Sequence, residues 1–393
     1  MGVFEMKTVM NHLTDPLLSS LAQSHPNKQL IQKILKQERL TPGEGEELYQ
    51  MDLPLIGMLA TWVRKQKNGE DVFFNHNIHL EPTNICVYDC HFCSYHRKAH
   101  EEGAWSFSNQ EMLQKVEAAA HKGITEVHIV GGVHPDRDIH YYGSLIEQIH
   151  KNYPTIHIKA FTAVEIDFMC KKARMPLDEG FRYLKDRGLG SLPGGGAEIF
   201  NPQVRKKVCH EKSNGEDWLQ IHKEAHKQGL HSNATMLYGH IESLTDRIDH
   251  MQQLRQLQDI TKGFNAFIPL KFKNANNRLS HIPEATLLED MKNYAVARIF
   301  LDNIPHIKAY WPMIGKDAAQ LALSFGVDDL DGTIEDSTRI YTMAGSKETN
   351  PAMSTHDLIH LIHQTGLRAV ERDTLYRPLQ SFEPETTKNI SES

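Results

Sequence analysis

Three cysteines lie within eight residues of one another in a chain of 393 residues that has only five. Cys86, Cys90 and Cys93 have the spacing C-x3-C-x2-C and follow a short run that predicts a strand. Thiolates are the usual ligands of iron–sulfur clusters, and the four irons of a cubane need four ligands. Three thiolates leave one iron open, which a small molecule with an amino group and a carboxylate can chelate. The spacing therefore predicts a 4Fe-4S cluster with an open fourth iron.

A structural zinc site is the alternative interpretation of these cysteines. Zinc prefers a closed tetrahedral ligand set, and His91 or His96 could supply its fourth member. Phe92 directly precedes the third cysteine, where an aromatic ring can pack near a bound adenine. Cys170 and Cys209 stand alone and are expected to be ordinary buried thiols. An odd cysteine count in a chain of this length argues against a disulfide framework and favours a reducing compartment.

Glycine-containing turns follow later predicted strands. Gly131 and Gly132 end the second strand, where the lack of a Cβ lets the backbone approach a ligand. The segment Ser191–Glu198 contains three consecutive glycines, and the Glu198 carboxylate could accept hydrogen bonds from ribose hydroxyls. We expect both turns to contribute to a cofactor site.

A scaffold must bring these loops together. From Asp71 onward, short apolar segments alternate with amphipathic helical segments. The predicted strands are Asn77–Leu80, Glu126–Val130, His157–Thr162, Gly190–Leu192, His231–Leu237, Ala266–Leu270, His306–Trp311 and Asp328–Leu330. The pattern predicts an α/β fold, a TIM-type (β/α)8 barrel or a partial (β/α)6 barrel with appended elements. The cysteines then lie on a βα loop at the C-terminal face of the barrel, where active sites form.

Helical patterns flank the predicted barrel on both sides. Thr41 is expected to cap a helix that has Pro42 at its first position. A further helix is predicted near Ser354–Thr365, before a polar tail that begins after Gln380. The predicted units are an N-terminal helical extension (1–70), the core barrel (71–345), and a C-terminal helix with a flexible tail (346–393).

Composition narrows the classes of partner. The formal net charge is -7, with no Lys/Arg-rich run, which argues against a nucleic-acid or anionic-membrane surface. No apolar stretch approaches the roughly 18 residues that a membrane span needs. The first residues, MGVFEMKTVMNHL, lack an apolar signal core. We therefore expect a cytoplasmic protein without membrane or nucleic-acid partners.

The cysteine spacing, its place after the first strand and the order of the glycine turns together resemble the radical S-adenosylmethionine superfamily. The resemblance implies that the three cysteines hold the cluster and that S-adenosylmethionine (SAM) is a co-substrate. The segment Ser232–Glu242 resembles the superfamily's adenine element G-x-I-x-G-x-x-E, with Thr235 in place of the first Gly and Leu237 in place of Ile. The implied SAM-binding residues are Phe92, Gly131, Gly132, Glu198, Thr235 and Leu237.

Other segments are similar to the futalosine branch of menaquinone biosynthesis, and the later ones resemble its aminofutalosine synthases. The segments are His157–Glu165, Leu192–Phe200, Ser232–Glu242, Phe264–Leu270, His306–Trp311, Asp328–Thr333 and Met343–Gly345. The resemblance implies a transferase that adds the 5′-deoxyadenosyl radical to 3-[(1-carboxyvinyl)oxy]benzoate, giving 6-amino-6-deoxyfutalosine and bicarbonate. The alternatives are the cyclase that acts on dehypoxanthine futalosine and, from another class, a zinc-stabilised binding protein.

The implied substrate carries two carboxylates, which call for Arg, Lys or His donors. Candidates near strand ends and on neighbouring loops are His79, Lys159, Lys271, Lys308, His134 and Arg97. Glu165 and Asp331 are candidates for moving protons during bicarbonate release. The resemblance also implies a reducing electron donor of the flavodoxin or ferredoxin type.

Overall fold

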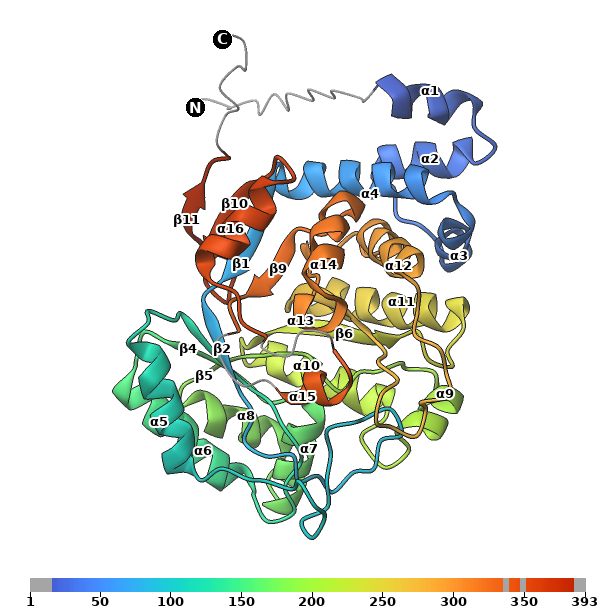
Figure 1. Cartoon of the computed structure of the whole chain (residues 1–393). Coiled ribbons are helices and arrows are strands. Elements are labelled where there is room, and N and C mark those ends of the chain that lie inside the picture. The colour runs from blue at the N-terminus through green and yellow to red at the C-terminus, as the bar shows by residue number, and fades with distance from the viewer. Residues whose placement is uncertain (1–15, 335–338, 347–350, 385–393) are drawn as a thin grey trace, which may run out of the picture.

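A curled sheet of parallel strands lies at the centre of the molecule (Figure 1). The computed structural model describes residues 16–334, 339–346 and 351–384. Seven strands lie side by side in chain order in one curled sheet. They are β2 (Asn77–Leu80), β3 (Glu126–Ile129), β4 (His157–Ala160), β5 (Leu189–Leu192), β6 (His231–Tyr238), β7 (Phe264–Lys271) and β8 (His306–Ile307).

A further strand, β9 (Asp329–Gly332), lies beside β8 but belongs to a second sheet. It meets β8 through a bridge between Lys308 and Asp329 and pairs with β1 (Asp71–Asn75), which leads into β2. All eight predicted strands are present, and the predicted α/β fold is confirmed as a partial barrel whose curled sheet contains seven parallel strands. Strand β8 is shorter than predicted, because the chain turns into helix α13 (Trp311–Ile314), which has a proline in its first turn.

A buried carboxylate joins the last two barrel strands. Asp328, which precedes β9, accepts hydrogen bonds from the backbone N–H of Ile307 (2.8 Å) and from Asn68 Nδ2 (2.7 Å). It also pairs with His306 (2.6 Å) and with Arg298 of α12 (Leu287–Phe300). Both the Arg298 and the Asp328 side chains are fully buried. A buried charge without its partner is costly, so this cluster is expected to fix the seam between β8 and β9.

Helices cover the outer face of the curled sheet and one end of the partial barrel. The predicted N-terminal helices are present as α1 (Pro16–Ser24), α2 (Lys28–Leu35), α3 (Pro42–Gln50) and α4 (Leu53–Asn68). Thr41 caps α3 as predicted, in a reciprocal capping box with Glu44. The main outer helices are α5 (Asn109–Ala120), α6 (Ile139–Asn152), α7 (Ala163–Lys172), α8 (Leu177–Lys185), α10 (Gly215–Lys227), α11 (Leu244–Thr261), α12 and α14 (Lys316–Ala322).

The C-terminal region contains more structure than the sequence indicated. The predicted helix is present as α16 (Thr355–His363). Strand β10 (Arg368–Arg372) then pairs parallel to β1, and β11 (Pro378–Phe382) pairs antiparallel to β10. The chain is thus still in a strand where the flexible tail was expected to begin, and residues 385–393 lie outside the described part. Figure 1 shows this sheet and α1, α2 and α4 at the top, and the light-blue loop after β2 along the bottom.

Replacing Asp328 should test the seam. Asp328→Ala leaves the buried Arg298 guanidinium without its counter-charge, so we expect the free energy of unfolding to fall by about 3–5 kcal/mol. Asp178→Ala is the matched control, because its pair with Arg182 is about half exposed and is worth at most about 1 kcal/mol. Urea unfolding followed by circular dichroism compares the two. Similar losses in both variants would mean that Asp328 does not hold the seam.

Candidate active site

The predicted cluster ligands lie on the long loop between β2 and α5, at the C-terminal end of β2. Cys86, Cys90 and Cys93 are all half-buried. Backbone hydrogen bonds fold the loop on itself, from Cys86 N–H to the Arg97 carbonyl (3.0 Å) and from Cys93 N–H to the Cys90 carbonyl (3.1 Å). The Lys98 ammonium donates to the Val87 carbonyl at 2.9 Å. The three thiols are therefore presented from one internally bonded loop.

The glycine turn after β3 touches this loop directly. Gly132 N–H donates to the Thr83 carbonyl at 2.7 Å, and Val133 N–H points at Cys86 Sγ at 3.4 Å. A Cβ added at Gly132 would lie 2.4 Å from the Ile85 carbonyl oxygen, closer than side chains approach backbone. A Cβ at Gly131 would lie 2.9 Å from the Thr83 carbonyl oxygen. Both positions need glycine because the two backbones lie against each other.

The donor set suits a cluster better than a single ion. Burial raises the pKa of all three thiols, so nearby cations are needed to stabilise three thiolates. Among the described residues, no three Cys, His, Asp or Glu side chains converge on a point that could hold one metal ion. A zinc site needs such convergence, whereas in a cubane each thiolate binds a different iron. His96 is already paired with Asp89, at 3.1 Å.

Two of the predicted adenine contacts share an apolar patch. Phe92, beside the cysteines, and Leu237, on β6, pack into the same small cluster of side chains. Its other buried members are Val208, Cys209, Phe272 and Leu279. Cys90 also packs against this patch. The structure thus brings Phe92 and Leu237 together with Cys90, one of the predicted cluster ligands, in an arrangement that offers an apolar surface to a planar base.

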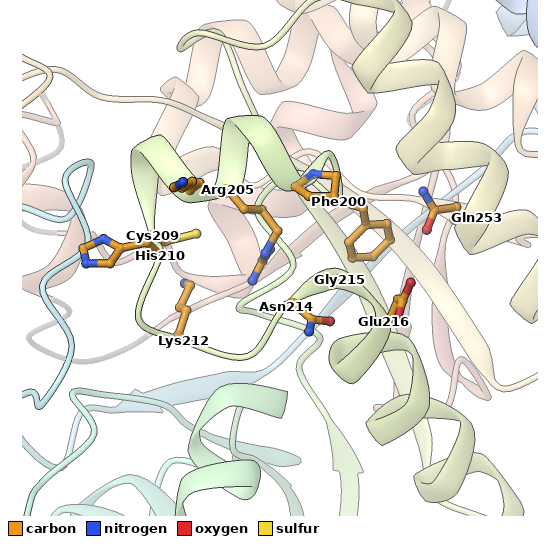
Figure 2. Close-up of a pocket in the computed structure, with 11 residues that line it drawn as sticks. Phe200, Arg205, Cys209, His210, Lys212, Asn214, Gly215, Glu216 and Gln253 are labelled. Carbon is orange, nitrogen blue, oxygen red and sulfur yellow. The ribbon is translucent and has the colours of Figure 1, made fainter.

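Glu198 lies next to this patch in an ion pair. It has a left-handed backbone (φ +47°), and its carboxylate pairs with Lys212, whose ammonium lies 5.2 Å from the centre of the Phe92 ring. Buried Arg205 of α9 (Pro202–Val208) donates to the Ala197 carbonyl at 2.5 Å and steadies the turn. A pocket of about 410 Å³, which Arg205 helps to line, lies beside this turn. Figure 2 shows Arg205 and Cys209, with Lys212 on the loop that leads to Asn214.

Thr235, predicted to stand in place of a glycine of the adenine element, uses its hydroxyl in a hydrogen bond to a neighbouring turn. Thr235 Oγ1 donates to the Gly194 carbonyl at 2.8 Å, which ties β6 to the glycine turn after β5. A Cβ at Gly194 would lie 2.1 Å from the Asn233 carbonyl oxygen, so that turn also lies directly on β6. In this chain the Thr235 side chain therefore links β6 to the glycine turn.

Glu165 braces the start of a helix. It forms a capping box with Thr162 at the N-terminus of α7, and it accepts a hydrogen bond from Gly131 N–H at 3.2 Å. Burial raises its pKa to about 7 despite these hydrogen bonds. Glu165 thus positions the glycine turn, and its pKa also suits a group that exchanges a proton near neutral pH. Its proton-transfer role remains a prediction.

The predicted carboxylate-binding residues divide into two groups, the first of which lies inside the barrel. Lys159 of β4 pairs with Glu126 of β3 at 2.6 Å, and Lys308 pairs with Asp331 of β9. His79 of β2 lies 3.7 Å from Asp331. The Lys308 ammonium holds the pKa of the buried Asp331 well below its usual range. These side chains form a buried polar floor on which the charges of both lysines are already paired.

The second group lies away from that floor. Arg97 donates to the Ser94 (3.1 Å) and His96 carbonyls within the cysteine loop, and Lys271 pairs with Asp290 at 2.7 Å. His134 accepts a hydrogen bond from Asp136 N–H. Arg97 also lines an open groove of about 710 Å³ next to the cysteines, which leaves the loop accessible from outside. The remaining lining residues are Cys90, His91, Cys93, His96, Glu101, Glu102, Asn276, Asn277, Arg278 and Ser280.

Sequence reasoning missed two neighbours of these groups. Lys212 carries no motif, and only the fold places it against Glu198 and Phe92. His128 stands beside His79 in the sheet, at a strand position where alternation alone could have flagged an inward polar side chain. Both residues belong to the candidate site because Lys212 contacts Glu198 and Phe92, and His128 contacts His79.

Comparison with known proteins agrees with this geometry. Residues 80–254 match the Radical SAM superfamily, and residues 261–384 match the CofH/MqnC C-terminal region. The fold is also similar to that of methylornithine synthase, with a TM-score of 0.68 at 16% sequence identity, covering 86% of this chain and 96% of that one. That likeness concerns the fold alone.

Curated relatives are similar over almost the whole chain. An aminodeoxyfutalosine synthase of Thermus thermophilus is 42% identical, covering 95% of this chain and 99% of the relative. One of Streptomyces coelicolor is 40% identical, covering 91% and 95%. A cyclic dehypoxanthine futalosine synthase of Streptomyces coelicolor is 34% identical, covering 87% and 86%.

The barrel, the cysteine loop and these matches define a class of enzyme that works with a 4Fe-4S cluster, SAM, a reductant and a small-molecule substrate. The chain belongs to the radical SAM superfamily, in the group that carries the CofH/MqnC C-terminal region. Within the described residues, no helix combines the length and the apolar character that a membrane crossing requires.

The contact between the glycine turn and the cysteine loop generates a prediction. In Gly132→Ala the new methyl group would meet the Ile85 carbonyl, and overpacking of this kind costs about 1–3 kcal/mol. We expect SAM affinity to fall by roughly ten-fold or more, and the iron content after anaerobic reconstitution to fall as well. Equilibrium dialysis and iron analysis provide the measurements.

Gly43→Ala is the matched control, since no heavy atom lies within 4 Å of a Cβ at that helical position. Gly43→Ala should change neither the SAM affinity nor the iron content. Wild-type affinity and iron content in Gly132→Ala would show that the close approach is unimportant for the site.

Proposed function

We propose that this enzyme is an aminodeoxyfutalosine synthase, which converts 3-[(1-carboxyvinyl)oxy]benzoate, SAM and water to 6-amino-6-deoxyfutalosine, methionine, bicarbonate and a proton. The observation that carries the proposal is the 40–42% identity to two such synthases over more than nine-tenths of this chain. The cysteine loop, the glycine turn and the apolar patch support it, since the fold assembles them at one end of the barrel. The cyclase, represented at 34% identity, is the weaker alternative.

In this proposal Cys86, Cys90 and Cys93 hold the cluster, which together with bound SAM supplies the 5′-deoxyadenosyl radical. The turn at Gly131 and Gly132 would hold the methionine end of SAM, since it lies against the cysteine loop. Phe92 and Leu237 would hold the adenine, because they form one apolar patch. Glu198 would accept hydrogen bonds from the ribose, with Lys212 holding its carboxylate in place. Thr235 would act through the glycine turn.

The substrate's carboxylates would face the polar floor of the barrel, around His79 and Lys159. Asp331 would then act mainly by keeping Lys308 and His79 in place, and Glu165 could exchange a proton near its pKa of about 7. His134 and Arg97 would act at the rim of the site. A flavodoxin- or ferredoxin-type donor would reach the cluster through the groove beside the cysteines.

The ligand assignment is testable by metal analysis. Anaerobically reconstituted wild-type protein should contain about four irons and four sulfides per chain. Cys86→Ala, Cys90→Ala and Cys93→Ala should each lose most of both, because no other thiol is placed to replace them within the loop. Cys170→Ala is the control, since Cys170 packs between α7 and α8 against Gly180. Full iron in any of the three loop variants would refute the assignment.

Cys209→Ala should also keep its iron. It is a more demanding control than Cys170→Ala, because Cys209 shares the apolar patch with Cys90. Iron loss in Cys209→Ala would mean that a ligand has been misassigned.

Product analysis separates the synthase from the cyclase. With SAM labelled with ¹³C in its adenosyl ribose, a reductant and the carboxyvinyl ether, we expect the label to appear in 6-amino-6-deoxyfutalosine by mass spectrometry. Methionine should form in equal amount. Labelled free 5′-deoxyadenosine as the main product, with turnover of dehypoxanthine futalosine, would instead identify the cyclase.

A further inference from the structure

Three side chains form a hydrogen-bonded series across the barrel interior. His128 Nδ1 on β3 lies 3.1 Å from His79 Nε2 on β2, and His79 Nδ1 lies 3.3 Å from the Tyr310 hydroxyl. The two imidazole rings meet edge to face, with their centres 4.3 Å apart. His128 Nε2, at the end of the series, is buried and has no hydrogen-bond partner among the described residues. Such an atom calls for a partner that the protein itself does not supply.

The nearby carboxylate of Asp331 favours a hydrogen on His79 Nε2, which sets one direction for the hydrogen bonds of this series. Asp331 Oδ2 lies 3.7 Å from His79 Nε2, so a hydrogen on that nitrogen faces a carboxylate on one side and His128 on the other. His128 Nδ1 is then the acceptor, and the Tyr310 hydroxyl donates to His79 Nδ1. A neutral imidazole carries one hydrogen, so that of His128 lies on Nε2. Burial, reinforced by neighbouring His79 and Lys159, holds the pKa of His128 well below its usual value, which keeps the ring neutral.

The position of His128 places its Nε2 nitrogen near the predicted cofactor site. It lies on β3, three residues before Gly131 of the turn that lies against the cysteine loop. The neighbouring cations already have counter-charges, because Lys159 pairs with Glu126 and Lys308 pairs with Asp331. His128 Nε2 is a buried nitrogen without a hydrogen-bond partner among the described residues, and a carboxylate oxygen is a natural acceptor for its hydrogen.

We propose that His128 Nε2–H donates a hydrogen bond to a carboxylate of the aromatic substrate and holds that substrate beneath the bound SAM. The inference rests on the proposed function and adds a specificity-determining residue to it. His79 and Tyr310 act as positioning residues, because they fix which nitrogen of His128 carries the hydrogen.

The test compares His128→Leu, which removes the donor at similar size, with His128→Gln, whose amide restores a donor. Affinity for 3-[(1-carboxyvinyl)oxy]benzoate is measured by calorimetry on reconstituted, SAM-loaded protein without reductant. We expect the Kd to rise about 10- to 100-fold in His128→Leu, the range for a lost hydrogen bond to a charged group. His128→Gln should recover most of the affinity, and SAM affinity should be unchanged in both variants.

His157→Gln is the matched control. His157 lies on the adjacent strand β4, but its Nε2 already has a partner in Ser191 Oγ at 2.8 Å, so substrate affinity should be unchanged. Wild-type affinity in His128→Leu, or equal losses in the Leu and Gln variants, would overturn the inference. The proposed function fails differently: the wild-type protein would then convert none of the carboxyvinyl ether, whatever the His128 variants bind.

Discussion

The site depends on the contact between two backbones that only glycine permits. The turn after β3 lies so close to the cysteine loop that a single methyl group at Gly132 would collide with the Ile85 carbonyl. That closeness lets Gly132 donate to Thr83 and lets Val133 N–H reach Cys86 Sγ. Glu165 holds the same turn from the other side, through Gly131 N–H. The predicted cluster loop and the predicted methionine-binding turn are therefore held together by direct contacts, and β2, β3 and α7 position them.

The side chains around the loop and the turn fall into an apolar group and a polar group. On one side, Phe92 and Leu237 share an apolar patch suited to a base. On the other, His79, His128 and the paired lysines form a polar floor suited to carboxylates. The buried Asp328 cluster joins β8 to β9, so the strands that carry Lys308 and Asp331 keep their register. A radical intermediate needs protection from solvent, and the interior of the curled sheet, with its internally paired charges, offers a sheltered site.

Much of this arrangement could be predicted from local patterns. The strands, the capped helix α3 and the cysteine loop were predicted because spacing, alternation and capping residues are local properties. Strands β10 and β11 were missed because β10 pairs with β1, about 300 residues earlier in the chain. Helix α7 was missed although Thr162 and Glu165 form a capping box, since Glu165 was interpreted only as a proton carrier. The partners of Lys159 and Lys308 likewise depend on strand neighbours that no local pattern reveals.

The most direct test of the account is the electron paramagnetic resonance spectrum of the reduced, reconstituted protein with and without SAM. If three cysteines leave one iron open beside the glycine turn, SAM will chelate that iron and change the g-values of the cluster signal. If the spectrum is identical in the presence of saturating SAM, the cluster has no open iron within reach of SAM, and the account of the site is wrong.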